Sequence, residues 1–215
     1  MISFMNVEGF SIPVTERRSD TLRKTAEARH ITNRYGEFYI AVYESNALQH
    51  LALVKGDVRG RDDVPVRIQS ACLPGTALDS ADCDCREQLE GSLEIVSQNG
   101  NGIVLYMDEE GRGLGLTTKV QALANKNKGL DTFEAVRFLG KPEDVRDFLA
   151  AANIIKDLGI ASVQLITNNP AKISSLQRQG VVVNSRIAIE IPATDETRRH
   201  LLAKKQAGHF LAQFD

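Results

Sequence analysis

The three cysteines of this chain lie close together in the sequence, at Cys72, Cys83 and Cys85. Their number excludes a zinc site closed by four thiolates. Three thiolates leave one position of a zinc ion open for water, which is the arrangement found in catalytic zinc sites. The histidines, which could close a structural site, all lie far from this cluster in the sequence, at His30, His50, His200 and His209. The pattern therefore predicts an open, catalytic type of zinc site.

Two other interpretations of the cysteines stay open at this point. Free cysteines are common as small buried apolar residues, and two of the three could form a disulfide in an oxidising compartment. The odd number of cysteines and an N-terminus without an export signal argue against a disulfide framework. Cys83 and Cys85 would point the same way from an extended segment, and the turn at Pro74 and Gly75 could return Cys72 to them. Metal ligation is the interpretation that this spacing favours.

Three further segments are candidates for chemistry. Glu110–Gly115 follows a predicted strand, but it lacks the third glycine of a dinucleotide-binding loop. It is interpreted as a turn that brings Arg112 to an anionic ligand, with a plain turn as the alternative. Thr167–Lys172 lies at a strand-to-helix turn, where a hydroxyl, a lysine and backbone N–H groups suit phosphate. Asp144–Asp147 has an ordinary structural explanation, because acidic residues stabilise the start of a helix.

The composition bounds the class of protein. With 215 residues, 42% hydrophobic and 25% charged, the chain is expected to form one globular domain, or one domain with an appendage. The net charge of -2 gives no reason to expect a nucleic-acid partner. The longest apolar runs, such as residues 102–107, are too short to cross a bilayer, so no membrane partner is expected and the cytoplasm is the expected location.

The hydrophobic pattern predicts the elements that position these groups. Strands are expected over 38–43, 51–55 and 64–68, paired antiparallel. A helix is expected after Cys85, ending at Asn99 and Gly100, followed by a strand over 103–107. Later helices are expected over 118–127, 145–158 and 171–179, with strands over 162–166 and 181–183. This order predicts a mixed α/β (α+β) fold, in which a β-rich N-terminal portion leads into an alternating helix and strand core.

The domain organisation follows from the same pattern. Residues 1–30 are polar and are expected to form a helical or loosely ordered N-terminal extension, and residues 31–215 are expected to form the catalytic domain. Near the C-terminus, Lys204 and Lys205 are expected to lie on a solvated helix face.

Taken together, the motifs over roughly residues 30–211 resemble the GTP cyclohydrolase II family, whose zinc enzymes open the imidazole ring of GTP at the start of riboflavin synthesis. The resemblance rests on six segments that follow one another in the same order: Arg67–Leu73, Asp82–Leu89, Glu110–Leu116, Gly129–Thr132, Asp144–Asp147 and Thr167–Pro170.

The resemblance implies a role for each matching residue. Cys72, Cys83 and Cys85 would hold one Zn²⁺, whose water attacks C8 of guanine and, in a second hydrolysis, releases formate. Arg146 would attack the α-phosphate and expel pyrophosphate, with Asp144 as its proton acceptor. The nucleotide-binding positions of the family fall on Arg67, Ser70, Gln88, Glu110, Gly111, Arg112, Thr132, Thr167 and Lys172. The resemblance also implies Mg²⁺ with the nucleotide and a homodimer.

The chain departs from the family pattern at five positions. Gln69 and Ala71 stand where the family has histidine and glutamate, and Asp108 and Glu109 stand where it commonly has arginine and glutamine. The added negative charge would weaken the attraction for a triphosphate unless a cation compensates it. Leu123 aligns with a tyrosine, and leucine cannot transfer a proton.

Three classes of function follow. The first is a working enzyme on GTP, with a relative that stops at the formamide product or uses another purine nucleotide as its variant. The second is a nucleotide-binding regulator without turnover. The third is a zinc-stabilised structural or interaction module.

Overall fold

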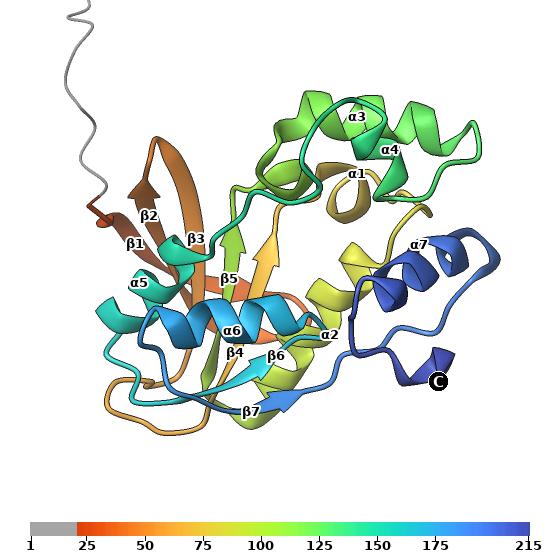
Figure 1. Cartoon of the computed structure of the whole chain (residues 1–215). Coiled ribbons are helices and arrows are strands. Elements are labelled where there is room, and N and C mark those ends of the chain that lie inside the picture. The colour runs from red at the N-terminus through yellow and green to blue at the C-terminus, as the bar shows by residue number, and fades with distance from the viewer. Residues whose placement is uncertain (1–20) are drawn as a thin grey trace, which may run out of the picture.

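A single seven-stranded sheet forms the centre of the computed structural model, which describes residues 21–215 (Figure 1). The part of the expected N-terminal extension that precedes residue 21 lies outside the described residues. The strand order is β1-β2-β3-β5-β4-β6-β7. The strands are β1 (Arg23–Thr32), β2 (Gly36–Ser45), β3 (Leu48–Lys55), β4 (Val64–Ser70), β5 (Gly102–Met107), β6 (Val163–Ile166) and β7 (Val183–Ile187).

The sheet has an antiparallel half and a parallel half. Strands β1, β2, β3 and β5 pair antiparallel in that order, whereas β4 pairs parallel with β5 and with β6, and β6 pairs parallel with β7. The prediction that the strand over residues 64–68, now β4, pairs antiparallel with the strand over residues 51–55, now β3, was wrong. Strand β4 lies in the interior of the sheet, and its continuous run of buried residues suits a strand covered on both faces.

Strand β1 corrects a second expectation. Residues 23–30 belong to this strand rather than to a helical or loose segment. The strand is exposed along nearly its whole length, so it carries polar residues on both sides and shows no alternation in the sequence. Its backbone pairing with β2 decides its conformation.

The helices are α1 (Leu73–Thr76), α2 (Cys85–Asn99), α3 (Gly115–Lys126), α4 (Glu134–Arg137), α5 (Leu149–Asp157), α6 (Pro170–Arg178) and α7 (Asp195–Gln206), with 3₁₀ turns η1 (Glu110–Gly113) and η2 (Ala212–Phe214). The prediction for α2 is confirmed, including its end at Gly100, which adopts a left-handed φ of 76°. Strand β7 begins at Val183, two residues after the start expected at residue 181. None of the helices within residues 21–215 combines the length and the apolarity that crossing a membrane requires.

Helix α5 begins later than the sequence predicts. Phe148 has a left-handed φ of 59°, which interrupts the helical pattern, and residues 141–148 form a loop. Asp147 accepts a hydrogen bond from the N–H of Leu149 at 2.9 Å, so one acidic residue of the segment does serve the start of the helix. Asp144 is not part of this cap, which leaves its carboxylate for the site described below.

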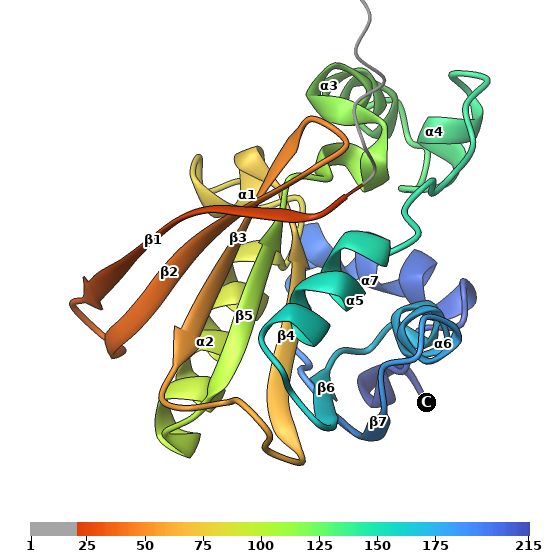
Figure 2. The ribbon, with the colours of Figure 1, turned by 90° about the vertical axis from the view of Figure 1, so that its left-hand side faces the viewer.

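Two hydrophobic clusters cover the two faces of the sheet. Along β5, Ile103 and Leu105 pack in the cluster with α5 and α6, whereas Val104 packs with Val96 of α2 on the other face. Figure 2 shows α2 behind the sheet and α5 in front of it. The mixed α/β class is confirmed. Because β4, β5 and β6 run parallel, their carboxyl ends lie at one edge of the sheet, and ligand sites in such folds form at that edge.

Candidate active site

The three cysteines meet at the carboxyl end of β4. This strand ends at Ser70 and the chain continues into Cys72, which precedes α1, while Cys85 is the first residue of α2. The three sulfur atoms all lie within 4.8 Å of one another, and no carboxylate or imidazole of residues 21–215 joins the group. All three are free thiols, and Cys72 Sγ lies 3.7 Å from Cys83 Sγ, so the disulfide interpretation is excluded.

Gly75 of α1 packs directly against these sulfur atoms. A Cβ atom at this position would lie 2.7 Å from Cys83 Sγ and 2.9 Å from Cys72 Sγ, closer than any ordinary contact. Helix α1 is a single turn, and hydrogen bonds from the N–H and the hydroxyl of Thr76 to the Cys72 carbonyl close it. The glycine therefore lets the backbone form one wall of the sulfur cradle.

The pKa values of the three thiols indicate that one of them ionises readily and that the other two need a nearby cation to ionise. The hydrogen bonds from Cys83 and Cys85, followed by the ammonium of Lys119, hold the pKa of Cys72 far below its ordinary value. The same crowding raises the pKa of Cys83, and raises that of Cys85 further, because neighbouring negative charge opposes a second thiolate. A divalent ion is what would allow all three to ionise. The donor set of Cys72, Cys83 and Cys85 therefore fits zinc with one open position.

Lys119 of α3 and Glu110 support the cradle from one side. Lys119 Nζ donates to Cys72 Sγ at 2.9 Å and pairs with Glu110 Oε1 at 2.9 Å. Burial opposes the ammonium form, but these two partners outweigh burial and raise the pKa of Lys119 above its ordinary value. Glu110 Oε2 also accepts from the N–H of Leu73 at 2.6 Å. The Glu110 carboxylate, predicted to bind substrate, is thus held by protein groups beside the cysteines.

The glycine-rich turn packs against the loop that precedes α5. Gly111 and Arg112 both adopt left-handed conformations, with φ of 61° and 60°. A Cβ at Gly113 would lie 2.8 Å from Val145 Cγ2, so this position requires glycine for close approach. The turn presents the Arg112 guanidinium to the Phe133 ring, 4.0 Å from its centroid. Burial, together with the nearby charge of Arg146, lowers the pKa of Arg112 to about 10.

Asp144 and Arg146 form a two-pronged ion pair at this edge. Arg146 Nε donates to Asp144 Oδ1 at 2.8 Å, and Nη2 pairs with Oδ2. Burial raises the pKa of Asp144, but the hydrogen bonds and charge of Arg146 outweigh that effect, so the net pKa lies below its ordinary value. Arg146 Nη1 also donates to Ser70 Oγ at 2.9 Å, which ties the pair to the end of β4.

Two buried cations border the same cavity as this pair and the cysteines. Arg67 of β4 donates to Gln69 and to Gln88, each at 2.6 Å, and burial lowers the pKa of Arg67 to about 10. Lys172 of α6 is 7% exposed and donates to the Ile68 carbonyl at 2.7 Å. Burial, and then the charges of Arg67 and Arg146, push the pKa of Lys172 well below its ordinary value. Without an anion, these positive charges repel one another.

The departures from the family pattern lie in the same region. Gln69, in place of histidine, accepts from Arg67 and donates to the Cys85 carbonyl at 3.3 Å. Glu109 Oε2 accepts from the hydroxyl of Ser70 at 3.5 Å, and burial raises the pKa of Glu109 despite the nearby Arg146. Leu123, in place of tyrosine, borders the same cavity as the cysteines.

All of the predicted site residues except Glu110 border one cavity. They are Cys72, Cys83 and Cys85 at the metal cradle, Asp144 and Arg146, and the predicted nucleotide-binding residues Arg67, Ser70, Gln88, Gly111, Arg112, Thr132, Thr167 and Lys172. Thr167 follows β6 and is 2% exposed. The structure thus brings together residues from all six segments of the family resemblance, and the roles of the individual residues stay predictions.

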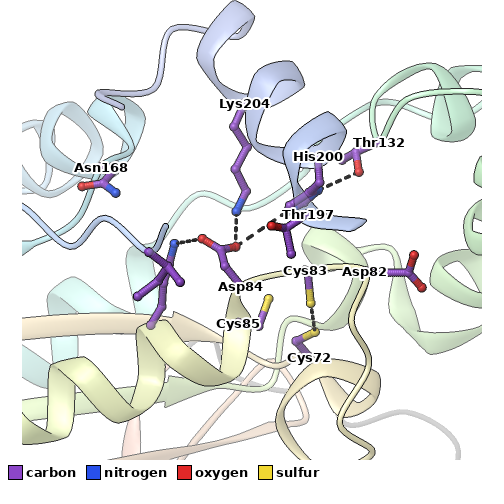
Figure 3. Close-up of polar contacts among 12 residues, drawn as sticks. Cys72, Asp82, Cys83, Asp84, Cys85, Thr132, Asn168, Thr197, His200 and Lys204 are labelled. Carbon is purple, nitrogen blue, oxygen red and sulfur yellow. Dashed lines mark hydrogen bonds and ion pairs between the residues drawn. The ribbon is translucent and has the colours of Figure 1, made fainter. Parts of the chain in front are cut away.

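Sequence reasoning missed the contribution of α7. Lys204 is not on a solvated face, because its ammonium lies 2.7 Å from Asp84 Oδ1 and only 17% of its side chain is exposed (Figure 3). His200 lies one helical turn earlier, and its Nδ1 is 2.8 Å from Thr132 Oγ1. A spacing of four residues on one helix face is the signal that could have paired them.

The fold and the site define a class of protein: an α/β domain that places a cluster of three thiols and several cations around one cavity. The family model described as "GTP cyclohydrolase II" matches residues 23–188. The chain therefore belongs to the GTP cyclohydrolase II family, a family of hydrolases, and the family resemblance seen in the sequence is confirmed.

Relatives named "Riboflavin biosynthesis protein RibBA" are similar to the chain. The protein of Chlamydia muridarum is 42% identical over 196 residues, which cover 89% of this chain and 46% of the relative. That of Nocardia farcinica is 43% identical over 196 residues, with 89% and 47% covered. The chain thus spans about half the length of these curated relatives. A solved structure titled "Crystal structure of RibBX, a two domain 3,4-dihydroxy-2-butanone 4-phosphate synthase from A. baumannii" has a TM-score of 0.45 and 19% identity, covering 80% of this chain and 42% of that one.

Proposed function

We propose that the chain is a GTP cyclohydrolase II of riboflavin biosynthesis. In this proposal it hydrolyses GTP, opens the imidazole ring of guanine, releases pyrophosphate and formate, and leaves a ribosylaminopyrimidine phosphate. One observation carries the proposal: the cysteine cradle and the Asp144–Arg146 pair border the same cavity. A nucleotide that spans the cavity would have its base at the first and its phosphates at the second.

The proposed binding of the triphosphate is supported by the positive charges around the cavity. Arg67, Arg112 and Lys172 are largely buried cations whose pKa values are lowered by burial and by their neighbours. A polyanion that enters between them would relieve this repulsion, because opposite charge favours the protonated forms. Lys172 and Thr167 flank the start of α6, where backbone N–H groups favour phosphate oxygens. Mg²⁺ bound with the nucleotide would offset the carboxylate of Glu109.

Arg146 and Asp144 would act on the α-phosphate. The guanidinium nitrogen would attack phosphorus as the bond to the pyrophosphate oxygen breaks, and its proton would pass to the Asp144 carboxylate. That carboxylate is in place to take the proton, because it lies 2.8 Å from Arg146 Nε. Water would later hydrolyse the N–P bond, which frees Arg146 and leaves the phosphate on the product. The hydroxyl of Ser70 orients the guanidinium from the other side.

At the opposite end, Cys72, Cys83 and Cys85 would hold the zinc. When bound there, zinc supplies Lewis acidity and lowers the pKa of water toward neutrality. Lys119 would balance the negative charge of the Cys72 thiolate through its contact at 2.9 Å. Gln69 and Gln88 would stay oriented toward the substrate through their hydrogen bonds with Arg67.

The assembly of the working protein is carried over from the family resemblance. We propose a cytoplasmic homodimer with one Zn²⁺ per chain, whose catalytic domain includes strand β1 and so starts before residue 31.

The decisive experiment incubates the zinc-loaded protein with GTP and Mg²⁺ and measures pyrophosphate, formate and the pyrimidine product separately. We expect GTP consumption that Arg146→Ala lowers by at least about a thousandfold, as expected for loss of a nucleophile. Arg29→Ala is the matched control, because Arg29 pairs with Glu37 on the exposed hairpin of β1 and β2. Nucleotide binding without consumption would instead support a regulator. Chelation that unfolds the protein, combined with no thermal shift by GTP, would support a structural module.

A second candidate reaction stops at the formamide and releases pyrophosphate without formate. It is favoured by Leu123, which borders the cavity and cannot transfer a proton. Leu123→Tyr would then add formate release to a wild-type enzyme that lacks it. Formate in equal amount to pyrophosphate from the wild type would exclude this candidate.

A further inference from the structure

Helix α7 places two inward side chains on the site, and both lie beyond residue 188, where the match to the family model ends. The helix begins with a capping box between Thr194 and Thr197, which fixes its first turn. His200 and Lys204 follow one turn apart and point to the cysteine-bearing segment (Figure 3). Both border the cavity.

Lys204 compensates a charge that would otherwise be costly. Asp84 stands between Cys83 and Cys85, is 2% exposed, and so carries a carboxylate beside three thiols. Lys204 Nζ lies 2.7 Å from Asp84 Oδ1, while Gln88 Nε2 donates to Oδ2. Truncating one member of such a buried pair leaves an uncompensated charge. The turn that carries two of the three thiols is therefore held from above by α7 and from below by α2.

His200 connects the same turn to the loop after α3. Its Nδ1 lies 2.8 Å from Thr132 Oγ1, and its Nε2 lies 3.8 Å from Asp84 Oδ1, without a hydrogen-bond partner among residues 21–215. Burial, and then the charge of Lys204, push the pKa of His200 well below its ordinary value, so the ring is neutral. A neutral ring that accepts the Thr132 hydroxyl at Nδ1 carries its proton on Nε2, facing the Asp84 carboxylate.

Two lysines lie against the negative groups around the thiols. Lys119 contacts Cys72 Sγ and also pairs with the Glu110 carboxylate. Asp84 adds another negative charge, which Lys204 offsets. Without Lys204, the buried Asp84 carboxylate would lose its partner, and the turn would shift to return that carboxylate to water. The shift would move Cys83 and Cys85 out of the geometry that a metal requires, which would lower the metal affinity less than loss of a ligand would.

We propose that Lys204 and His200 of α7 are positioning residues for the active site: Lys204 orients the Cys83-Asp84-Cys85 turn for metal binding, and His200 holds Thr132 in place for the nucleotide. The part that concerns Thr132 rests on the proposed function, whereas the part that concerns the metal does not require turnover.

The test of Lys204 compares zinc affinity, measured by competition with a chromogenic chelator. We expect Lys204→Met to lower the affinity 10- to 100-fold and Lys204→Arg to restore most of it. Lys205→Met is the matched control, because Lys205 pairs with Asp215 at the surface, and it should keep wild-type affinity. In the Asp84→Asn background, Lys204→Met should have a much smaller effect, because the charge it compensates is gone. The thiolate-to-metal absorption of the Co²⁺ form reports the same turn spectroscopically.

The inference about Lys204 is overturned if Lys204→Met binds zinc as tightly as the wild type, or if Lys205→Met loses as much. For His200, we expect His200→Leu to weaken the binding of a non-hydrolysable GTP analogue about tenfold, with zinc affinity lowered less. Arg199→Leu, which changes an exposed neighbour, should leave both unchanged. Unchanged analogue binding by His200→Leu overturns that part. Absence of GTP turnover in the wild type would overturn the proposed function, while the zinc comparison would still decide the role of Lys204.

Discussion

Gly75→Ala should damage the metal site while sparing the fold. The added Cβ would lie 2.7 Å from Cys83 Sγ and 2.9 Å from Cys72 Sγ. Ordinary contacts begin near about 3.5 Å, so the sulfur atoms would have to move by roughly 0.6 to 0.8 Å. Metal sites tolerate deviations of about 0.2 Å in their bond lengths. We therefore expect zinc affinity to fall by about 10- to 100-fold, equivalent to about 1.4 to 2.7 kcal/mol.

The assay is chelator competition, combined with thermal unfolding of the zinc-free protein. Alanine favours a helical turn over glycine by up to about 1 kcal/mol, so the zinc-free Gly75→Ala protein should unfold no more easily than the zinc-free wild type. Gly91→Ala in α2 is the matched control: its added Cβ meets Ile189 Cδ1 at 3.4 Å, an ordinary contact. It should keep zinc affinity and gain stability. Wild-type zinc affinity in Gly75→Ala would refute the idea that these three sulfur atoms form one metal cradle.

Three further predictions follow from the same geometry. Phe133→Leu removes a cation–π contact with Arg112 that contributes about 1 to 2 kcal/mol. Steady-state assays should therefore show a rise of about 5- to 30-fold in the KM for GTP. An unchanged KM would contradict the idea that Phe133 positions Arg112 for the nucleotide. Burial, and then the charge of Lys204, lower the pKa of His209 to about 4. Because the unfolded chain takes up this proton at about pH 6.5, the free energy of unfolding should fall as the pH drops from 6.5 to 4. His209→Gln should reduce that fall by about 1 kcal/mol after allowance for solvent screening, measured by urea titration at both pH values, and an equal fall in the variant would contradict this. Chelation should abolish GTP turnover yet leave a cooperative melting transition in circular dichroism, because the main core clusters cover the faces of the sheet; loss of that transition would assign the metal a structural role.

Much of the fold was predictable because its signals are local. Helix α2 has apolar residues at helical spacing and ends at Gly100, and β5 is a short apolar run bounded by turn residues. The position of β4 in the sheet was not predictable in this way. Its apolar run identifies a buried strand, but its choice of neighbours depends on where α2 returns the chain. The late start of α5 was hidden as well, because the left-handed φ of Phe148 carries no sequence signal.

The site, like the fold, has features that the sequence predicts and features that it does not. Residue type and spacing predicted the cysteine cluster and a phosphate-binding turn at Thr167–Lys172, whereas Asp144, Arg146 and Arg67 were predicted as site residues only from the family resemblance. Their arrangement was not predictable. Glu110 has the carboxylate expected of a substrate ligand, yet the structure directs it to Lys119 and to the N–H of Leu73. Such choices depend on packing between segments that the sequence does not place side by side.

The sequence by itself determined which atoms are available, namely a trio of thiols with no fourth partner nearby and cations suited to phosphate, since these depend on residue identity and short spacing. Tertiary structure alone decided which groups face one another. Asp84 and Lys204 are 120 residues apart and meet at 2.7 Å, and Gly75 touches sulfur atoms of a different turn. Contacts over such separations follow from the path of the chain through the sheet, which no local pattern encodes.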